Sequence, residues 1–134
     1  MPGLLLIAHA PLASALKAVA EHTFPNCAPQ LTVLDVTPDM SADDVETAAR
    51  ELLQIAGYSE ALVLTDVFGA TPCNAAMRLQ SSQLRVVSGV NVPMLWRALC
   101  YVAEPLDALV QRACQGGING IVPSDPPANL YLES

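Results

Sequence analysis

The chain has 134 residues, of which 52% are hydrophobic and 14% charged, so it can bury one compact core and carries too little charge for a disordered polymer. Its formal net charge of −7 repels nucleic-acid phosphates and anionic membrane surfaces. Aromatic residues make up only 4%, which favours a core of aliphatic side chains, as in sheets covered by helices. We therefore expect one α/β domain that binds no nucleic acid and does not insert into a membrane.

Two features of the sequence predict a cytoplasmic protein. The apolar opening, residues 4–8, is too short to cross a bilayer, and it lacks the charged leader of a signal peptide because Lys17 is the first basic residue. The cysteines form no C-x-x-C pair, and a chain of this length folds without disulfides. We expect four free and mostly buried thiols, at Cys27, Cys73, Cys100 and Cys114.

The first half of the chain alternates between short apolar runs and helical patterns. Residues 4–8 predict a strand, and apolar side chains at helical spacing follow over residues 12–20. A second strand is predicted over residues 31–36. The helix after it has defined ends, because Ser41 can cap its first turn and Gly57 can end it in the left-handed conformation.

The same alternation continues with a strand over residues 61–65 and another over residues 84–88. Between them, Thr71 and Pro72 are typical of the N-cap and the first turn of a helix, which we expect to reach Leu79.

The C-terminal third is predicted to be helical until shortly before its end. One helix is expected over residues 93–99 and another over residues 106–114, ended by the glycine pair at 116–117. Residues 120–122 then suggest a short edge strand, because Pro123 cannot donate to a sheet. We expect the domain to span residues 1–122 and to be followed by a proline-rich tail, residues 123–134.

Together these elements predict an α/β fold with an open, mainly parallel sheet. The sheet has four strands in the order 2-1-3-4 and helices on both faces, with the short C-terminal strand at an edge.

Polar side chains end two neighbouring strands of this predicted sheet. His9 closes the first strand and Asp66 closes the third, and adjacent strands lie about 4.8 Å apart. In open parallel sheets, ligands bind beyond the carboxyl ends of the strands. A carboxylate bonded to one imidazole nitrogen fixes the ring and leaves the other nitrogen free as a nucleophile. We therefore expect His9 and Asp66 to form a catalytic pair.

Backbone N–H groups are expected to hold an anion beside this pair. Helices that begin after His9 and at Thr71 would direct their first N–H groups toward the same crevice. The phosphate-binding residues predicted here are Gly69, Ala70 and Thr71. We expect no cofactor and no metal, since the two histidines have none of the usual metal-ligand spacings.

Three motifs in the same order resemble the mannose-type IIA component of the bacterial phosphotransferase system. The similarity extends over residues 1 to about 122, and its motifs are LLLIAH at 4–9, TDVFGATPCN at 65–74 and GVNVPML at 89–95. The resemblance implies that His9 is transiently phosphorylated by the histidine carrier protein HPr and passes the phosphoryl group to a IIB component. It also implies that Asp66 is the partner of the histidine, that Thr71 supplies a hydroxyl near the phosphate, and that residues 120–122 are exchanged between the subunits of a homodimer.

Two apolar residues are candidates for contact with HPr and IIB. Phe68 follows Asp66 in the loop, and Met94 lies early in the helix at 93–99, although apolar residues there are more often part of the core. For Asp35, at the end of the second strand, the expected role is to structure a loop.

Two alternatives stay open at the level of sequence. The same fold can serve as a regulatory module whose phosphorylation changes its affinity for a target protein. The chain can also be an unrelated enzyme, such as a thiol or metal-assisted hydrolase that uses Cys73 or His9, although a small residue packed beneath the loop is the more common role for such a cysteine.

Overall fold

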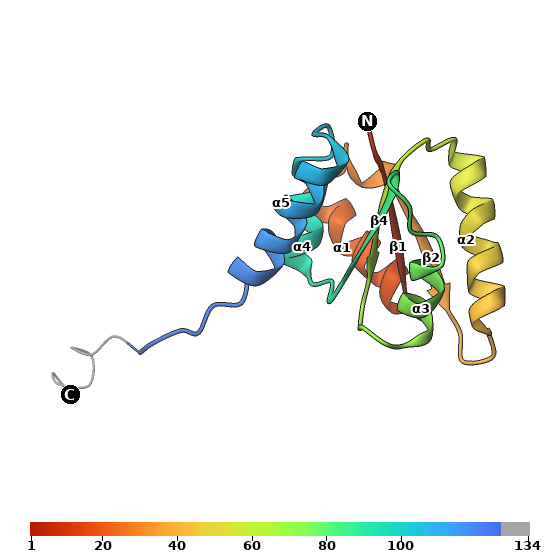
Figure 1. Cartoon of the computed structure of the whole chain (residues 1–134). Helices are drawn as coiled ribbons and strands as arrows, with labels where there is room; N and C mark the ends of the chain where they lie inside the picture. Colours follow the sequence, from red (N-terminus) through yellow and green to blue (C-terminus); the bar gives the residue numbers. More distant parts are fainter. Residues whose placement is uncertain (127–134) are drawn as a thin grey trace, which may run out of the picture.

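A computed structural model describes residues 1–126 of the chain. Its centre is a parallel sheet of four strands in the order β2-β1-β3-β4, which confirms the predicted topology (Figure 1). The strands are β1 (Gly3–His9), β2 (Leu31–Val36), β3 (Ala61–Thr65) and β4 (Leu84–Ser88). Because β1 and β3 are central and parallel, their carboxyl ends meet at one edge of the sheet.

Helices cover both faces of the sheet, as the α/β prediction requires (Figure 1). On one face lie α1 (Leu12–Thr23), α4 (Val92–Cys100) and α5 (Leu106–Asn119). On the other lie α2 (Ala42–Ala56) and α3 (Thr71–Met77). A single 3-10 turn, Ala28–Gln30, precedes β2.

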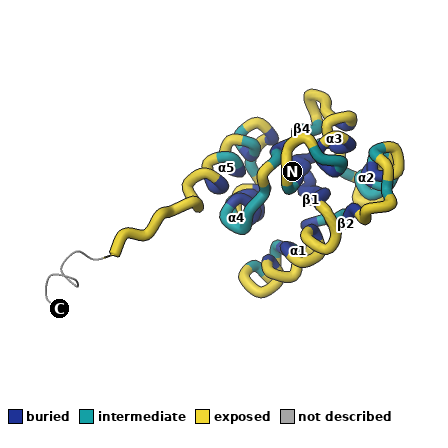
Figure 2. The backbone as a smooth tube through the Cα atoms, turned by 90° about the horizontal axis from the view of Figure 1, so that it is seen from below, coloured by how far each residue is buried: buried dark blue, intermediate teal, exposed yellow. Residues whose placement is uncertain are grey.

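The apolar run of β1 is buried on both sides, which explains why its pattern is continuous rather than alternating. Leu4 and Leu6 pack with α1, α4 and α5, whereas Leu5 and Ile7 pack with α2 and α3. Figure 2 shows this strand as the buried centre of the molecule. Each such side chain contributes about 1.5–3 kcal/mol on burial, so the core holds the end of β1 in a fixed place.

Local signals define both ends of α2. Ser41 Oγ accepts a hydrogen bond from Asp44 N at 3.1 Å, and the Asp44 carboxylate accepts one from Ser41 N at 3.0 Å, which completes a capping box. Gly57 ends the helix with φ 72°, a value that favours glycine.

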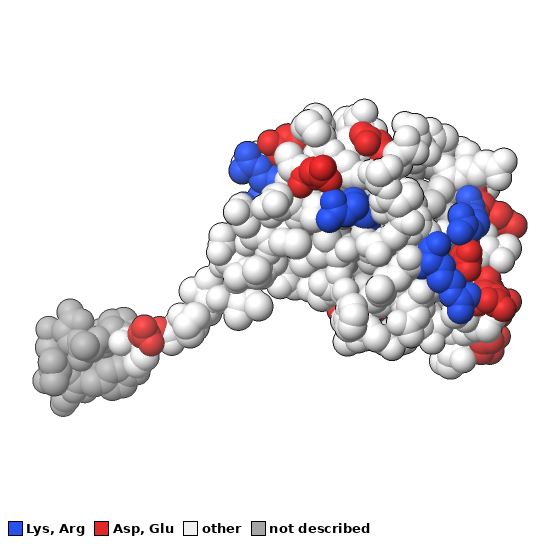
Figure 3. All heavy atoms as spheres, viewed as in Figure 1, with Lys and Arg blue, Asp and Glu red and all other residues white. Residues whose placement is uncertain are grey.

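Ion pairs join α2 to the C-terminal end of α3, with Arg78 Nη1 2.6 Å from Asp43 Oδ1. Figure 3 shows basic and acidic side chains side by side at the end of the molecule that carries α2.

We expect Ser41→Ala to lower the free energy of unfolding by about 1 kcal/mol, because the N–H of Asp44 loses its acceptor. Chemical denaturation followed by circular dichroism measures this loss. The control is Ser59→Ala, at an exposed position in the loop after α2, which should change stability by less than about 0.5 kcal/mol. Equal effects of the two substitutions would contradict the capping assignment.

The prediction that Thr71 caps α3 is wrong by one residue. Ala70 is the N-cap, with φ −91° and ψ 170°, because its carbonyl accepts the first helical hydrogen bond from Asn74 N at 2.9 Å. Thr71 is the first helical residue, and no side chain caps this end. The helix ends at Met77 rather than at Leu79.

The glycine pair at 116–117 does not end α5, which continues to Asn119. Both glycines lie where α5 packs against α4. A Cβ atom at Gly116 would lie 2.5 Å from Arg97 Cβ, and one at Gly117 would lie 2.8 Å from Met94 Cε. Close helix packing, not helix termination, is therefore the reason for these glycines.

Residues 120–122 do not form a strand within residues 1–126. Gly120 is the C-cap of α5, and Ile121 and Val122 are exposed. Three residues followed by Pro123 offer too few hydrogen bonds to hold an edge by themselves. Of the tail, residues 127–134 lie outside the described residues, and the division at residue 122 stays a prediction.

None of the helices within residues 1–126 combines the length and the apolar character that crossing a bilayer requires.

Candidate functional site

His9 and Asp66 meet at the carboxyl edge of the sheet, where β1 and β3 end. The distance between His9 Nδ1 and Asp66 Oδ2 is 2.7 Å, and the backbone N–H of His9 donates to the same oxygen at 3.0 Å. Val67 N donates to Asp66 Oδ1 at 2.9 Å. One carboxylate therefore fixes both the ring and the backbone of His9, as expected from the neighbouring strands.

The two members of this pair differ in their exposure to solvent. The side chain of Asp66 is 12% exposed and that of His9 is 52% exposed. Because an ionised carboxylate only accepts hydrogen bonds, Nδ1 is the protonated ring nitrogen. Nε2 then has a free lone pair, and the ring that carries it reaches solvent. The arrangement can act as a nucleophile toward an electrophile presented at this edge.

Several groups shift the pKa of Asp66. Partial burial by itself would raise it, but hydrogen bonds from the His9 ring and backbone, the positive charge that His9 carries when protonated, and the N–H of Val67 outweigh burial. The pKa of Asp66 is therefore lowered from its ordinary value of 3.8. The carboxylate stays ionised at neutral pH and remains an acceptor for Nδ1–H.

This lowered pKa predicts how the contribution of Asp66 to stability depends on pH. A carboxyl group whose pKa is lower in the folded state than in the unfolded state stabilises the fold when the pH is above the unfolded-state pKa. This stabilisation is lost as the pH falls through the folded-state pKa. We expect the difference in unfolding free energy between the wild type and Asp66→Asn to shrink as the pH falls from about 5 to 2. Urea titrations at each pH measure it. A difference that stays constant over this range would contradict the assignment.

The loop between β3 and α3 presents unpaired backbone donors beside the pair. Gly69 adopts φ 89°, which favours glycine, and its carbonyl accepts a hydrogen bond from Asn74 Nδ2 at 3.1 Å. Among residues 1–126, no protein group accepts from the N–H groups of Gly69, Ala70 and Thr71. Pro72 and Cys73 are buried directly behind them and anchor the loop. Such a row of free donors can receive the oxygens of an anion.

The two predicted partner contacts are placed differently. Phe68 is 73% exposed in the loop after Asp66 and is free to meet another protein. Met94 is only 5% exposed, because it lies on the inner side of α4 and packs against Gly117 of α5. The prediction of Met94 as a contact residue is wrong, since a side chain in the core cannot reach a partner.

The cysteines are all free, but the prediction that most of them are buried is wrong, because Cys73 alone of the four is fully buried. Cys73 is buried and its Sγ lies 3.8 Å from Ser88 Oγ, so it packs under the loop rather than facing the crevice. Cys100, by contrast, is exposed. No cluster of three or more potential metal ligands occurs in the part of the chain that the structure describes. The buried position of Cys73 does not favour a thiol hydrolase.

One contact near the site has no clear signal in the sequence. Asp35, at the end of β2, accepts hydrogen bonds from both the backbone and the hydroxyl of Ser14 in the first turn of α1. The sequence predicts that Asp35 structures a loop, but its partner Ser14 lies 21 residues away. Only the pairing of β2 with β1 brings the two together.

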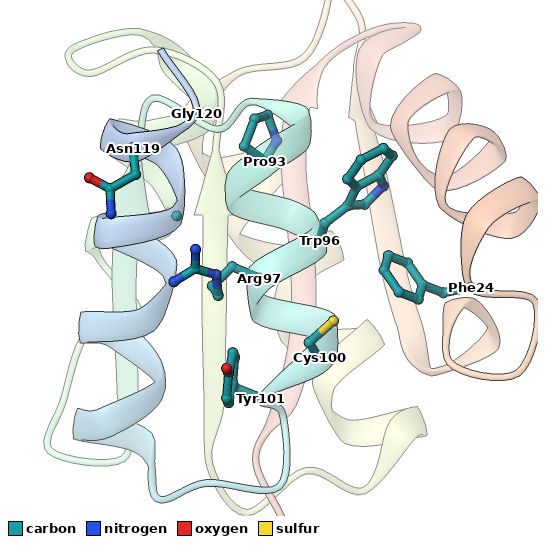
Figure 4. A pocket seen from close by; sticks show the side chains of 9 residues that line it. Phe24, Pro93, Trp96, Arg97, Cys100, Tyr101, Asn119 and Gly120 are labelled. Atoms are coloured by element: carbon teal, nitrogen blue, oxygen red, sulfur yellow. The ribbon is translucent and has the colours of Figure 1, made fainter. Parts of the chain in front are cut away.

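A groove of about 440 Å³ lies apart from His9, on the face formed by α4 and α5 (Figure 4). Figure 4 shows Trp96 and Phe24 pointing toward each other, and their rings meet edge to face with centroids 6.0 Å apart. Arg97 points to the other side of α4, toward α5. Neither His9 nor Asp66 lines this groove.

Comparisons with known proteins agree with the fold and with the motifs around the site. A family model, EIIA-man, described as the PTS system fructose IIA component, matches residues 3–114. A mannose/sorbose-specific IIA subunit of the phosphotransferase system from Enterococcus faecalis is 30% identical, with a TM-score of 0.86, and the match covers 94% of this chain and 96% of that chain. Component EIIA from Streptococcus agalactiae is 26% identical, with a TM-score of 0.83 and coverage of 92% and 97%.

A more distant structure shares the fold alone. A sigma-54 interaction domain protein from Enterococcus faecalis is 14% identical, with a TM-score of 0.69, over 84% of this chain and 87% of that chain. Among curated proteins, none matches. The family model covers most of the chain and the IIA subunit at 30% identity covers nearly all of it, so the chain belongs to the EIIA-man family of IIA components of the phosphotransferase system.

Proposed function

We propose that this protein is a phosphohistidine carrier of a phosphoenolpyruvate-dependent sugar phosphotransferase system. It accepts a phosphoryl group from HPr on His9 and passes it to a IIB component. The observation that carries the proposal is the 2.7 Å contact between His9 Nδ1 and Asp66, because it leaves Nε2 as the free nucleophile. Family membership supports the general role of a phosphotransferase component.

The transfer is an in-line exchange between two imidazoles. The lone pair of His9 Nε2 attacks the phosphorus of a donor phosphohistidine. One N–P bond forms while the donor N–P bond breaks, and the donor nitrogen keeps the electron pair of the broken bond. The proton on Nδ1 of His9 stays with the ring, held by Asp66, which stabilises the positive charge that the ring acquires. The same exchange in reverse, with a IIB component as acceptor, regenerates free His9.

Positioning and charge stabilisation supply the catalysis in this proposal. The free N–H groups of Gly69, Ala70 and Thr71 receive the phosphoryl oxygens, and the hydroxyl of Thr71 lies at the same end of α3. The proteins that donate and accept the phosphoryl group can contribute positive charge of their own, which is why an acidic chain suits the reaction. Phe68 contacts these partners from the exposed loop.

The direct test is phosphorylation from defined components. The protein is incubated with phosphoenolpyruvate, enzyme I and HPr, and its intact mass is then measured. We expect a gain of one phosphoryl group, which is lost in acid as expected for a phosphohistidine and is transferred when a IIB component is added. A protein that gains no phosphoryl group under these conditions would refute the proposal. A protein that is phosphorylated but transfers to no IIB component would instead favour the regulatory role.

We propose further that the protein works in the cytoplasm as a homodimer in which residues 120–122 add to the sheet of a second subunit. The exposed, β-branched side chains of Ile121 and Val122 support this proposal, since such residues favour strands and β4 is an edge strand of the sheet formed by residues 1–126.

We expect sedimentation to give a dimer, and Val122→Pro to shift the protein toward monomer because proline removes the N–H that pairs with β4. A matched control is Ser124→Pro, beyond the predicted strand, which should leave the dimer intact. A wild-type protein that is monomeric at all concentrations measured would contradict the exchange.

A further inference from the structure

The first turn of α1 is held by a side chain from another element. Pro11 is the N-cap of this helix and makes no side-chain cap bond, and no acidic residue lies in the first turn. The carboxylate of Asp35 in β2 instead accepts from Ser14 N at 3.1 Å with one oxygen and from Ser14 Oγ with the other. Asp35 therefore acts as a capping group for α1 that comes from a neighbouring strand.

The contact between Asp35 and Ser14 closes a short loop of the backbone, residues 8–14, that contains His9. Ala8 pairs with Asp35 in the sheet, and Ala10 N donates to Val36 O at 2.8 Å. The segment from Ala8 to Ser14 is thus tied to the end of β2 at both of its ends. On the other side, Asp66 accepts from the backbone N–H of His9. His9 is fixed between two carboxylates, of which only Asp66 touches its ring.

The charge of Asp35 matters as much as its geometry. The N-terminus of an α-helix carries a partial positive charge and free N–H groups, which attract anions. The carboxylate of Asp35 already occupies this end of α1, which begins three residues after His9. For a phosphoryl group on His9, the partial positive charge at the N-terminus of α1 would therefore already be neutralised by the Asp35 carboxylate, which also accepts the hydrogen bonds from Ser14. The free donors of residues 69–71 would be its main protein partners.

We propose that Asp35 is a positioning residue that, through Ser14, occupies the N-terminus of α1 and so limits how tightly a phosphoryl group is held on His9. This inference rests on the proposed function and deepens it. Asp35 keeps the phosphohistidine easy to pass on, because its carboxylate occupies the N-terminus of α1 in place of the phosphoryl group. Its contribution appears in the equilibrium of transfer rather than in the fold alone.

The test is the equilibrium constant for phosphoryl exchange between HPr and this protein, measured by intact mass at known ratios. We expect Asp35→Asn to shift the equilibrium about fivefold toward the phosphorylated protein, because the amide can still accept from Ser14 but no longer neutralises the helix end. Asp35→Glu retains the charge, and Ser14→Ala retains both the charge and the backbone bond. Each should stay within about twofold of the wild type.

The matched control is Glu51→Gln on the exposed side of α2, which changes the net charge equally and has no contact with this site. Thermal unfolding verifies that each variant folds. Should Asp35→Asn fail to fold, Asp35→Ser carries the same expectation. If Asp35→Asn gives the same equilibrium constant as Glu51→Gln, or a shift toward unphosphorylated protein, the inference is overturned while the carrier function stands. If the wild type is not phosphorylated at all, the proposed function fails and this inference falls with it.

Discussion

His9→Ala should take up no phosphoryl group from phosphorylated HPr. Within the part of the chain that the structure describes, the substitution removes the only nitrogen at this edge that has both a free lone pair and an ionised carboxylate to orient it. Among residues 1–126, the second histidine, His22, lies exposed in the last turn of α1 and makes no contact with Asp66. No other group in this region can replace the nucleophile, so we expect complete loss rather than a reduced rate.

Intact mass spectrometry after incubation with the phosphorylated donor measures this result. His22→Ala is the matched control, because it removes the same type of side chain from the last turn of α1 and should be phosphorylated like the wild type. His9→Ala also leaves the Asp66 carboxylate without its hydrogen bond from the ring, so thermal unfolding is used to verify that the variant is folded at the assay temperature. Labelling of His9→Ala at the level of His22→Ala would eliminate His9 as the acceptor.

Asp66→Asn should slow phosphoryl transfer by about 10²- to 10⁴-fold while leaving the fold in place. An asparagine can present its NH₂ group to Nδ1, and the ring proton then moves to Nε2, which is the nitrogen that must attack. The amide also carries no charge to stabilise the ring during transfer. Rapid-quench measurements of transfer from phosphorylated HPr determine the rate constant.

Asp39→Asn provides the comparison for this experiment. Asp39 is an exposed acid in the turn after β2 that bonds to Thr37 and not to His9, so its replacement changes the charge without touching the ring. Its rate should stay within about threefold of the wild type, the scale of a screened surface charge. An Asp66→Asn protein that also stays within this range would mean that the carboxylate does not orient the nucleophile.

Much of the fold could be predicted because its signals are local. The buried run of β1, the cap of Ser41 and the glycine at position 57 each act within a few residues of where they stand. The approach of His9 to Asp66 followed as well, since both residues end central strands of a parallel sheet. That prediction needed only the strand order, which the alternation of strands and helices restricts to few choices.

The incorrect predictions share one cause: the role of a given residue type depends on which other elements pack against it. Gly116 and Gly117 were predicted to end α5, but they lie inside it because α4 leaves no room for a Cβ atom. Met94 was predicted to face a partner, although the rotation of α4 turns it into the core. Thr71 is one residue past the N-cap because the carbonyl of Ala70 accepts the first bond.

The sequence by itself determined the α/β class, the order of the strands, most element boundaries and the pairing of His9 with Asp66. These features can be predicted because hydrophobic periodicity, capping residues and strand ends are local patterns, each contained in a short stretch of the sequence. Only the tertiary structure decided which face of α4 is buried, why α5 contains glycines, and that Asp35 holds the first turn of α1. Each of these depends on contact between residues far apart in the chain, whose spacing is set by the packing of whole elements rather than by any local pattern.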